Sequence, residues 1–367
     1  MRHGGRNAKQ LEHAALPPRC RLRVGELALA MLGVLAVGLV AACGTGASTA
    51  RPAAPVAEQP TASPAPLRLT LNWTAPSGVQ VPLWLAYERG IFREMGLEVE
   101  LVHIATTSRV IQAMAAGEVH LSPLDPATAV RATLGGAETV LLLAMTNHLN
   151  FAIMSQPSIQ EPQALLGKTL GVTRIGASTH TAALVALRGW GLVPDRDVSL
   201  RQLGEITAIP AALEAGQIDA GVISQPADRR LRAVYPTLLD LAVQGPEYPS
   251  VAIGGPRAWV ASNEEAVRRF THAYVLAVQQ AKRDKALAIE LFRQYMQVDD
   301  AERLEDIYVN FSHAVPDVPY VSEVGFRRVL DDLMGEEPRL AGRQPAEFID
   351  SRFVRELEAA GFFASRG

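Results

Sequence analysis

Two segments of the chain decide the fold because they repeat one pattern: AMAAGEVHLSPLDPA at residues 113–127 and ALEAGQIDAGVISQPA at residues 212–227. Each reads Ala-x-x-Ala-Gly, then a polar residue, a β-branched residue and, later, Pro-Ala. Gly117 and Gly216 are separated by the same number of residues as Gly90 and Gly189. A recurrent pattern with two anchors in phase predicts an internal repeat.

The elements around these segments recur in the same order. Short β-rich runs alternate with helical stretches, which is typical of α/β folds with largely parallel sheets. In the first half we expect strands at Leu67–Trp73, Leu97–Ile104 and Val119–Leu124, and helices at Pro82–Glu94 and Ser108–Ala116, the second ending at a left-handed Gly117. In the second half we expect strands at Thr169–Arg174, Val198–Leu203 and Ile218–Ser224, and helices at Thr179–Trp190 and Ile209–Ala215. The sequence therefore predicts two similar α/β lobes with a ligand cleft between them.

Composition excludes some classes of partner. The chain has 367 residues, of which 48% are hydrophobic and 20% charged, and its net charge is −3. Such a balance gives no strong positive field for nucleic acid, so we expect no nucleic-acid partner.

The N-terminus has the pattern of an export signal. Six basic residues precede an unbroken apolar run at residues 27–42. This run is shorter than the ~20 residues that span a bilayer, although a short membrane anchor remains an alternative. The run ends in Val40-Ala41-Ala42-Cys43, which resembles the bacterial lipobox with Val in place of Leu, and the resemblance implies lipidation of Cys43. We expect residues 1–43 to be a lipoprotein signal segment and residues 44–66, rich in Ala, Pro, Ser and Thr, to be a flexible tether.

Several motifs resemble one family, the extracytoplasmic solute-binding proteins of ABC importers of the nitrate, taurine, alkanesulfonate and thiamine-pyrimidine-precursor type. The similarity covers about residues 67–259, with His120 in place of the usual Asp. The motifs are PLWLAYERGIFREMGLEVELV (82–102), IQAMAAGEVHLS (111–122), ALLGKTLGVTRIGASTH (164–180), GWGLVPDRDVSL (189–200) and AALEAGQIDAGVISQP (211–226).

The resemblance implies a type II periplasmic-binding fold, α/β with two similar lobes and a hinge. Lobe 1 would hold residues 67–150 and 251–367, and lobe 2 residues 151–250, with hinges near 145–153 and 248–253. The C-terminal part would return to lobe 1 as helices, one opened by a capping box of Ser262 and Glu265 and carrying a core stripe of Val267, Phe270, Tyr274 and Val278. Expected partners are a small-molecule ligand, an ABC permease with its ATPase, and a membrane that holds the lipid anchor; we expect a monomer.

The start of the helix after residue 174 is a candidate ligand contact in lobe 2. Its free N–H groups favour an anionic or accepting group, and Ser178 and Thr179 add hydroxyls. Ser178 as an ordinary helix cap is the alternative, and His180 is expected to bond or pack rather than to catalyse. Arg109 and Arg174 lie near such strand ends, where surface ion pairs are the more common role.

The remaining candidates follow strand ends or hinges. Trp73 and Trp84 offer flat faces, although Trp84 lies in an apolar helical stripe and is equally well read as packed. Asp125 and Gln225 precede prolines and can instead be turn residues. The full set of expected ligand contacts is Trp73, Ser77, Gln80, Thr107, Ser108, Asp125, Thr146, Ser178, Thr179, His180 and Gln225.

The sequence shows none of the common catalytic or phosphate-binding motifs. We therefore expect a binding protein, with no enzyme activity, metal or cofactor. A ligand-sensing module for a membrane receptor is one alternative. A thiamine-pyrimidine synthase is another, but its cysteine-rich iron motif has no counterpart, because Cys20 and Cys43 are the only cysteines.

Overall fold

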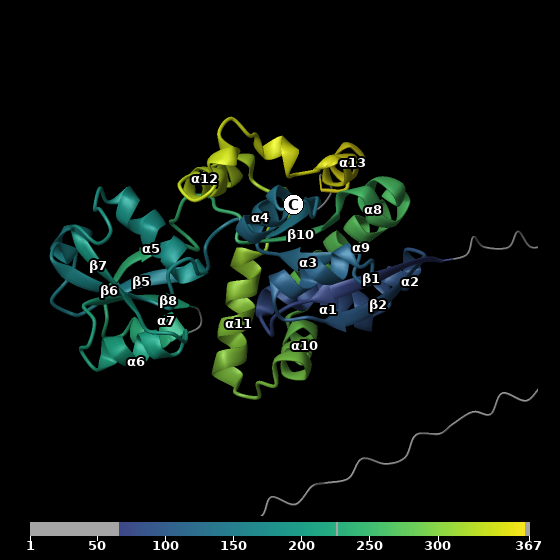
Figure 1. Cartoon of the computed structure of the whole chain (residues 1–367). Helices are drawn as coiled ribbons and strands as arrows, with labels where there is room; N and C mark the ends of the chain where they lie inside the picture. Colours follow the sequence, from purple (N-terminus) through teal and green to yellow (C-terminus); the bar gives the residue numbers. More distant parts are fainter. Residues whose placement is uncertain (1–65, 225–226, 364–367) are drawn as a thin grey trace, which may run out of the picture. The chain divides into compact units, whose positions relative to one another are not determined.

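The computed structural model describes residues 66–224 and 227–363, which belong to one compact unit (Figure 1). The expected signal segment, the lipidated Cys43, nearly all of the tether, and Gln225 lie outside the described residues. No helix in the part of the chain that is described is long and apolar enough to cross a membrane.

A first sheet forms from strands in the order β2-β1-β3-β10-β4. β1 and β2 are parallel, a bridge between Leu71 and Leu121 joins β1 to β3, and β10 is antiparallel to both β3 and β4. The strands are β1 (Leu67–Trp73), β2 (Leu97–His103), β3 (Ser122–Leu124), β4 (Thr139–Thr146) and β10 (Val251–Pro256).

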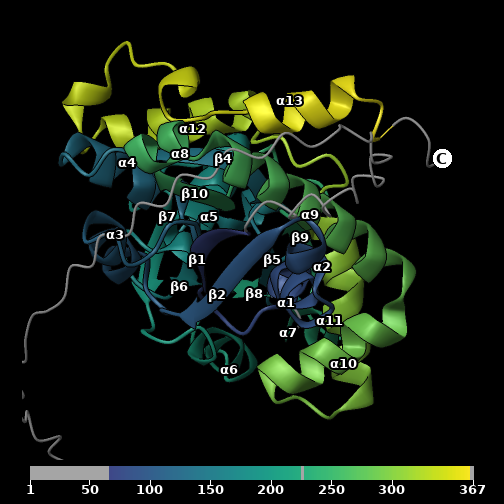
Figure 2. The same ribbon diagram turned by 90° about the vertical axis from the view of Figure 1, so that its right-hand side faces the viewer.

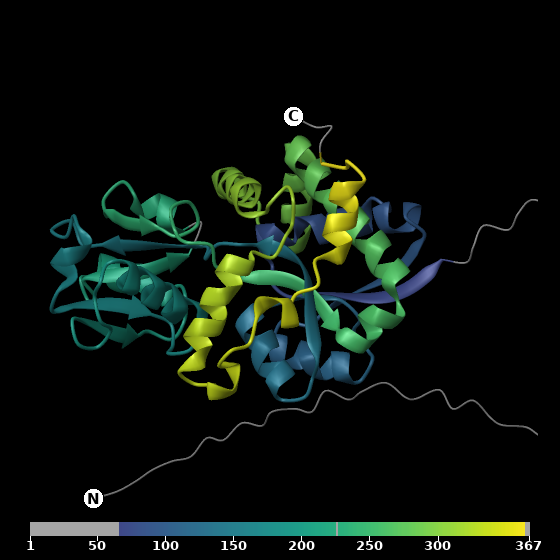
Figure 3. The same cartoon turned by 90° about the horizontal axis from the view of Figure 1, so that it is seen from above.

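The second sheet repeats this arrangement in the order β7-β6-β8-β5-β9. β6 is parallel to β7 and β8, and β5 is antiparallel to β8 and β9. Each sheet thus has a parallel trio followed by an antiparallel strand, and Figure 3 shows from above the connections between the two sheets. The strands are β5 (Phe151–Ser155), β6 (Lys168–Val172), β7 (Val198–Gln202), β8 (Ala220–Ser224) and β9 (Thr237–Asp240).

Helices follow the strands in both halves, and a C-terminal set packs mainly on the first sheet. Figure 2 shows α1 close to β1 and β2, and α13 packs against α9 and β4. The first-half helices are α1 (Val81–Glu88), α2 (Ile91–Glu94), α3 (Thr107–Ala115) and α4 (Pro126–Leu134); the second-half helices are α5 (Ser178–Gly189), α6 (Ala208–Glu214) and α7 (Ala227–Leu231). The C-terminal set is α8 (Arg257–Ser262), α9 (Glu264–Arg283), α10 (Lys285–Met296), α11 (Ala301–Ala314), α12 (Glu323–Met334) and α13 (Arg352–Ala359), and the 3₁₀ helices are η1 (Gly78–Gln80), η2 (Pro162–Leu165), η3 (Pro338–Leu340) and η4 (Pro345–Glu347).

The repeat predicted from Gly117 and Gly216 is confirmed in three dimensions. Both glycines have positive φ, 76° and 66°, and both end a helix with the same pair of backbone hydrogen bonds. Such a C-cap requires the left-handed region, which glycine adopts without strain. The pairing of Gly90 with Gly189 is wrong, because Gly90 has φ of 73° whereas Gly189 is the last residue of α5.

His120 occupies the position that Asp219 holds in the other half. The Nδ1 atom of His120 accepts the Thr70 N–H at 2.8 Å, and Oδ2 of Asp219 accepts the Thr169 N–H at 2.9 Å. His120 also stacks on Trp259, with ring centroids 4.8 Å apart. A neutral imidazole therefore replaces a carboxylate as the acceptor that ties the two strands.

We expect this replacement to make stability depend on pH. Burial lowers the pKa of His120 below its ordinary value of 6.5, so the folded state favours the neutral ring. The resulting stabilisation is complete above that value and is lost as the pH falls through 6.5 towards the lowered pKa. Because the ring is only partly buried, the loss should stay below about 1 kcal/mol.

The matched variant is His120→Asp, which restores the acceptor of the second half. Urea denaturation at pH 7.5 and pH 5.5 should show a smaller loss of stability for His120→Asp than for the natural chain. His180 and His272, whose pKa values are also lowered by burial, are present in both proteins and cancel in the comparison. Equal losses in the two proteins would contradict this role of His120.

The expected core stripe of α9 is confirmed, since Val267, Phe270, Tyr274 and Val278 are all buried. Three other local predictions are wrong. The single helix expected over 82–94 is divided by left-handed Gly90 into α1 and α2, and the strand expected from Val119 pairs regularly only from Ser122. The capping box does not form, because Ser262 ends α8 and Asn263 precedes α9.

Candidate functional site

One cavity is lined by residues that follow strands of both sheets, and it is the candidate ligand site. Its volume is about 300 Å³, at the small end of the usual range for ligand pockets. The start of α4 contributes from the first sheet, the start of α5 from the second, and Tyr248 from the connection between the sheets. α12 adds Asp332, and Glu336 comes from the turn that follows α12. We refer to it as the interlobe cavity.

Asp125 forms the first-sheet side of the interlobe cavity. It follows β3 and is the N-cap of α4, where its Oδ1 accepts the Thr128 N–H at 2.7 Å and Pro126 takes the first helical position. This is the expected arrangement for a helix that begins with Asp-Pro. The turn role and the site role of Asp125 are therefore compatible, because the cap uses only one of the two carboxylate oxygens.

The loop between β6 and α5 forms the second-sheet side. Ala177, not Ser178, is the N-cap of α5, and Ser178 is exposed at the first helical position without a side-chain capping bond. Thr179 is buried, and its hydroxyl accepts the Thr173 N–H at 2.9 Å and pairs with the Thr173 hydroxyl at 2.7 Å. Ser178 thus faces the cavity, while Thr179 holds the loop in place.

His180 completes the second-sheet side. Its Nδ1 accepts the Gly176 N–H at 3.3 Å, which uses one of the loop's donors internally. Burial lowers the pKa of His180, against the opposing effect of the Asp195 and Glu336 charges. The imidazole is therefore largely neutral at pH 7 and adds no full positive charge to the cavity.

Tyr248 and α12 give the cavity its acidic wall. Tyr248 is 6% exposed, and burial, together with the negative charges of Asp332 and Asp125, raises its pKa above the ordinary value. Asp332 pairs with Arg188 at 2.6 Å, and Glu336 pairs with Arg131 at 2.7 Å. The guanidinium groups of Arg131 and Arg188 are thus already engaged by these carboxylates.

The connections between the two sheets are tied by hydroxyl and amide groups. Thr146 ends β4, and its hydroxyl pairs with the Ser250 hydroxyl at 2.7 Å. The side chain of Asn147 donates to the Tyr320 carbonyl at 2.7 Å and accepts the Ser322 N–H at 3.0 Å. Three segments that are distant in sequence therefore meet at this point.

The aromatic candidates lie elsewhere in the first half. Trp73 stacks on His103, with centroids 3.9 Å apart, and meets Trp84 edge-on. Trp84 is fully buried, which confirms the packed alternative for that residue. Gln80 is 2% exposed, and its amide donates to the Thr74 hydroxyl.

The structure therefore brings only some of the expected contacts together. Arg109 and Arg174 are exposed, and neither forms an ion pair with another described residue. Those that line the interlobe cavity are Asp125, Ser178 and His180. Those that do not line it are Trp73, Ser77, Gln80, Thr107, Ser108, Thr146 and Thr179.

Among the lining residues that sequence reasoning missed, four are ionisable: Arg131, Tyr248, Asp332 and Glu336. Tyr248 is the first residue of the hinge expected near 248–253, and this position is the signal that could have identified it as a lining residue. Asp332 lies on α12 and Glu336 lies two residues after its end, and no local sequence pattern predicts the contact of α12 with α4.

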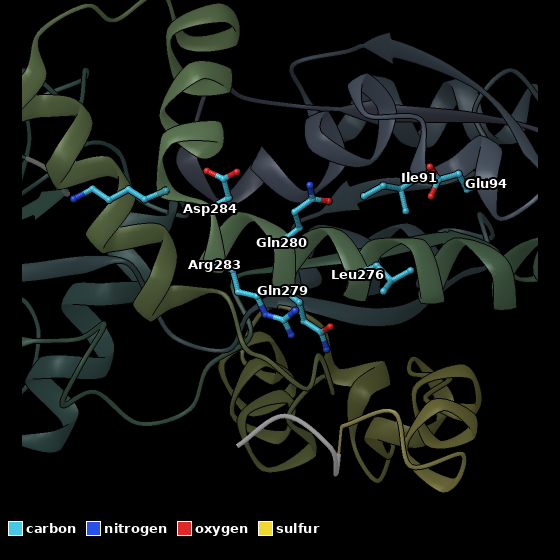
Figure 4. A pocket seen from close by; sticks show the side chains of 8 residues that line it. Ile91, Glu94, Leu276, Gln279, Gln280, Arg283 and Asp284 are labelled. Atoms are coloured by element: carbon cyan, nitrogen blue, oxygen red, sulfur yellow. The ribbon is translucent and has the colours of Figure 1, made fainter.

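A second cavity, of about 280 Å³, is also lined from both halves, with Asp228 and Arg232 on one side and His313 of α11 on the other, but it contains none of the expected contacts. A cavity of about 580 Å³ lies along α9, and its lining includes Leu276, Gln280 and Arg283 together with Ile91 and Glu94 of α2 (Figure 4). It contains none of the expected contacts. Within the described residues, no group of three or more His, Cys, Asp or Glu side chains is arranged to hold a metal ion.

Comparison with known families gives one match, to the family described as NMT1/THI5 like, over residues 79–286. This is more than half of the chain. No curated protein sequence matches.

Comparison with solved structures identifies the fold. The periplasmic aliphatic sulphonate binding protein SsuA from Escherichia coli is 18% identical, with a TM-score of 0.62 over 76% of this chain and 95% of that protein. The periplasmic nitrate-binding protein NrtA from Synechocystis PCC 6803 is 14% identical, with a TM-score of 0.56 over 80% of this chain and 89% of that one. The Candida albicans CA3427 gene product, which has the generic periplasmic binding protein fold, is 14% identical, with a TM-score of 0.54 over 80% and 95%. The expected periplasmic-binding fold is confirmed.

Proposed function

The chain belongs to the NMT1/THI5-like family, and from this premise we propose that it is the extracytoplasmic solute-binding protein of an ABC importer. It captures a small solute between its two lobes and delivers it to a membrane permease served by an ATPase. No bond of the solute changes. The lobes are residues 67–150 with 251–367, and residues 151–250.

The interlobe cavity is the observation that carries this proposal. Asp125 follows a strand of the first sheet, and Ser178 and His180 follow a strand of the second, yet all three line one cavity. In open α/β sheets, ligands bind outside the carboxyl ends of strands, and small-molecule sites favour the space between domains. The position of the interlobe cavity agrees with both preferences.

The connections between the sheets supply the hinge of the proposed mechanism. A solute that contacts both lobes stabilises the closed form by its extra contacts and so shifts the population towards closure. Thr146, Asn147 and Ser250 tie the crossing segments to one another by hydrogen bonds. Rotation would then occur about these residues, while the two sheets remain rigid.

The sulphonate- and nitrate-binding proteins with this fold support a role in solute uptake. A lipid on Cys43 would hold the monomeric protein at the membrane surface outside the cytoplasm. Replacing Cys43 by Ser should then release the protein from the membrane fraction, and a variant that stays in that fraction would contradict the lipid anchor.

Thermal-shift screening of the purified full-length protein tests the proposal. The solute classes are sulfonates, nitrate, carboxylated aromatics, pyrimidines and amines. A solute at 100 times its dissociation constant should stabilise the protein by about 2.7 kcal/mol. Small-angle X-ray scattering should show a smaller radius of gyration with that solute. If no class raises the melting temperature, or if binding leaves the radius unchanged, solute capture by closure is wrong.

A further inference from the structure

We propose that the interlobe cavity selects solutes that carry a protonated amine or another cationic nitrogen, and that it rejects solutes whose only charged group is an oxyanion. This inference rests on the proposed function, because it assigns a solute class to the same site. It is also the opposite of our expectation from the sequence, which was that the free N–H groups at the start of α5 favour an anionic solute group.

The charges around the cavity favour a cation. Three carboxylates line it, those of Asp125, Asp332 and Glu336, whereas Arg131 is the only lining guanidinium within the described residues. Arg131 is engaged by Glu336, and Arg188, the second nearby guanidinium, is engaged by Asp332. Within each ion pair the two charges largely cancel. The negative charge of Asp125 is therefore left for a positively charged solute to compensate.

Asp332 contributes negative charge to the cavity rather than a free acceptor. Its side chain is 11% exposed, and its Oδ2 is buried without a hydrogen-bond partner in the described structure. Arg188 bonds the other oxygen, Oδ1. Because this oxygen has no exposed surface, a solute in the cavity does not bond to it directly, and Asp332 instead contributes its negative charge beside the hydroxyl of Tyr248, whose pKa that charge raises.

Asp125 offers an acceptor from the opposite wall. Its Oδ1 is used by the α4 cap, and no described residue donates to its Oδ2. A solute ammonium has three N–H donors and can bond to more than one oxygen. Asp125 and Asp332 line the same cavity, so a cationic nitrogen bonded to Asp125 also lies in the field of the Asp332 charge.

The groups that would favour an oxyanion are largely committed or lie elsewhere. The Gly176 N–H donates to His180, the Ala177 N–H donates to the Arg174 carbonyl, and His180 is largely neutral. Arg109 and Arg174 do not line the cavity. The remaining N–H groups at the start of α5 can bind a neutral acceptor atom, but a solute with only a negative charge would face Asp125 without a free guanidinium.

Two pairs of compounds of like shape and opposite charge test this inference. They are propylammonium with propane-1-sulfonate, and benzylammonium with benzenesulfonate, each titrated into the purified full-length protein at pH 7 and constant ionic strength. Calorimetry should give a dissociation constant at least about tenfold lower for one of the ammonium compounds than for its sulfonate partner, as expected for a charge-assisted hydrogen bond.

The variant Asp125→Asn removes the charge but keeps the fold, because asparagine is an equally good N-cap. It should weaken ammonium binding at least about tenfold. The matched control is Glu98→Gln, which also changes a carboxylate to an amide but lies on β2, where Glu98 pairs with Arg68 at 2.7 Å. Its ammonium binding should equal that of the natural protein.

The outcomes separate this inference from the proposed function. Tighter binding of a sulfonate than of its ammonium partner would overturn the solute class while leaving solute capture intact. Ammonium binding that Asp125→Asn leaves unchanged would also overturn the inference, as would failure of both ammonium compounds to bind. The wider thermal-shift screen then shows whether solute capture itself survives.

Discussion

The variant Trp84→Ala should be less stable than the natural protein by about 3–5 kcal/mol, the range for removing a large aromatic side chain from a core. Trp84 is fully buried in the core of the first half. It stacks on Tyr295 with centroids 4.6 Å apart and a 5° angle between the planes, and Trp73 meets it edge-on at 5.6 Å. Alanine would leave a cavity between two aromatic rings that cannot both move to fill it.

Trp84→Phe separates the packing of the ring from its N–H group. The indole Nε1 is buried without a hydrogen-bond partner in the described structure, so losing this donor costs nothing. The phenylalanine variant should therefore lose much less stability than the alanine variant. Tyr87→Ala on the same helix is the surface control, because Tyr87 is 41% exposed. Chemical denaturation followed by far-UV circular dichroism measures all three, and equal losses for Trp84→Ala and Tyr87→Ala would refute the packing role.

The variant Thr179→Val should cost about 1–3 kcal/mol, the usual penalty for leaving a buried donor without its partner. Valine matches threonine in shape but cannot accept the Thr173 N–H or pair with the Thr173 hydroxyl. These two bonds fix the loop that presents Ser178 and His180 to the interlobe cavity. The variant should therefore also speed hydrogen exchange at the Thr173 amide.

Two neighbouring changes serve as controls for Thr179→Val. Thr179→Ser keeps the hydroxyl and should retain most of the stability and the slow exchange. Ser178→Ala removes an exposed hydroxyl without a described bond, so its stability should equal that of the natural protein within about 0.5 kcal/mol. A slow Thr173 amide in Thr179→Val would show that the hydroxyl does not hold the loop.

The fold could be predicted from the sequence because the signals that specify it are local and occur in both halves of the chain. A left-handed glycine after a helix is dictated by the chain itself, and both Gly117 and Gly216 have this role. The break at Gly90 was missed because the helical apolar pattern continues through it, and only the φ angle shows the turn. The capping box failed for a related reason, since Ser262 had a helix before it that the pattern did not reveal.

The candidate site was less predictable because its walls meet only after folding. Asp125 and Ser178 were recognisable from the strand ends that precede them. The acidic wall was not, because Asp332 of α12 and Glu336, which follows α12, are brought to the cavity by the contact of α12 with α4. Thr179 is the opposite case, because it was expected to contact the ligand but its hydroxyl bonds to Thr173 instead. A hydroxyl at a helix start can bond to a neighbouring threonine as readily as to a solute.

The position of β10 has a consequence for biosynthesis. β10 pairs with both β3 and β4, yet it is made only after all five strands of the second sheet. As the chain leaves the ribosome, the first sheet lacks the strand that joins β3 to β4 until residue 256 has emerged, whereas the second sheet is complete at residue 240. Contacts between distant residues form slowly, and units of a chain tend to fold separately. The second sheet should therefore reach its native form first, although it is synthesised later, while the first sheet stays incomplete until β10 is available.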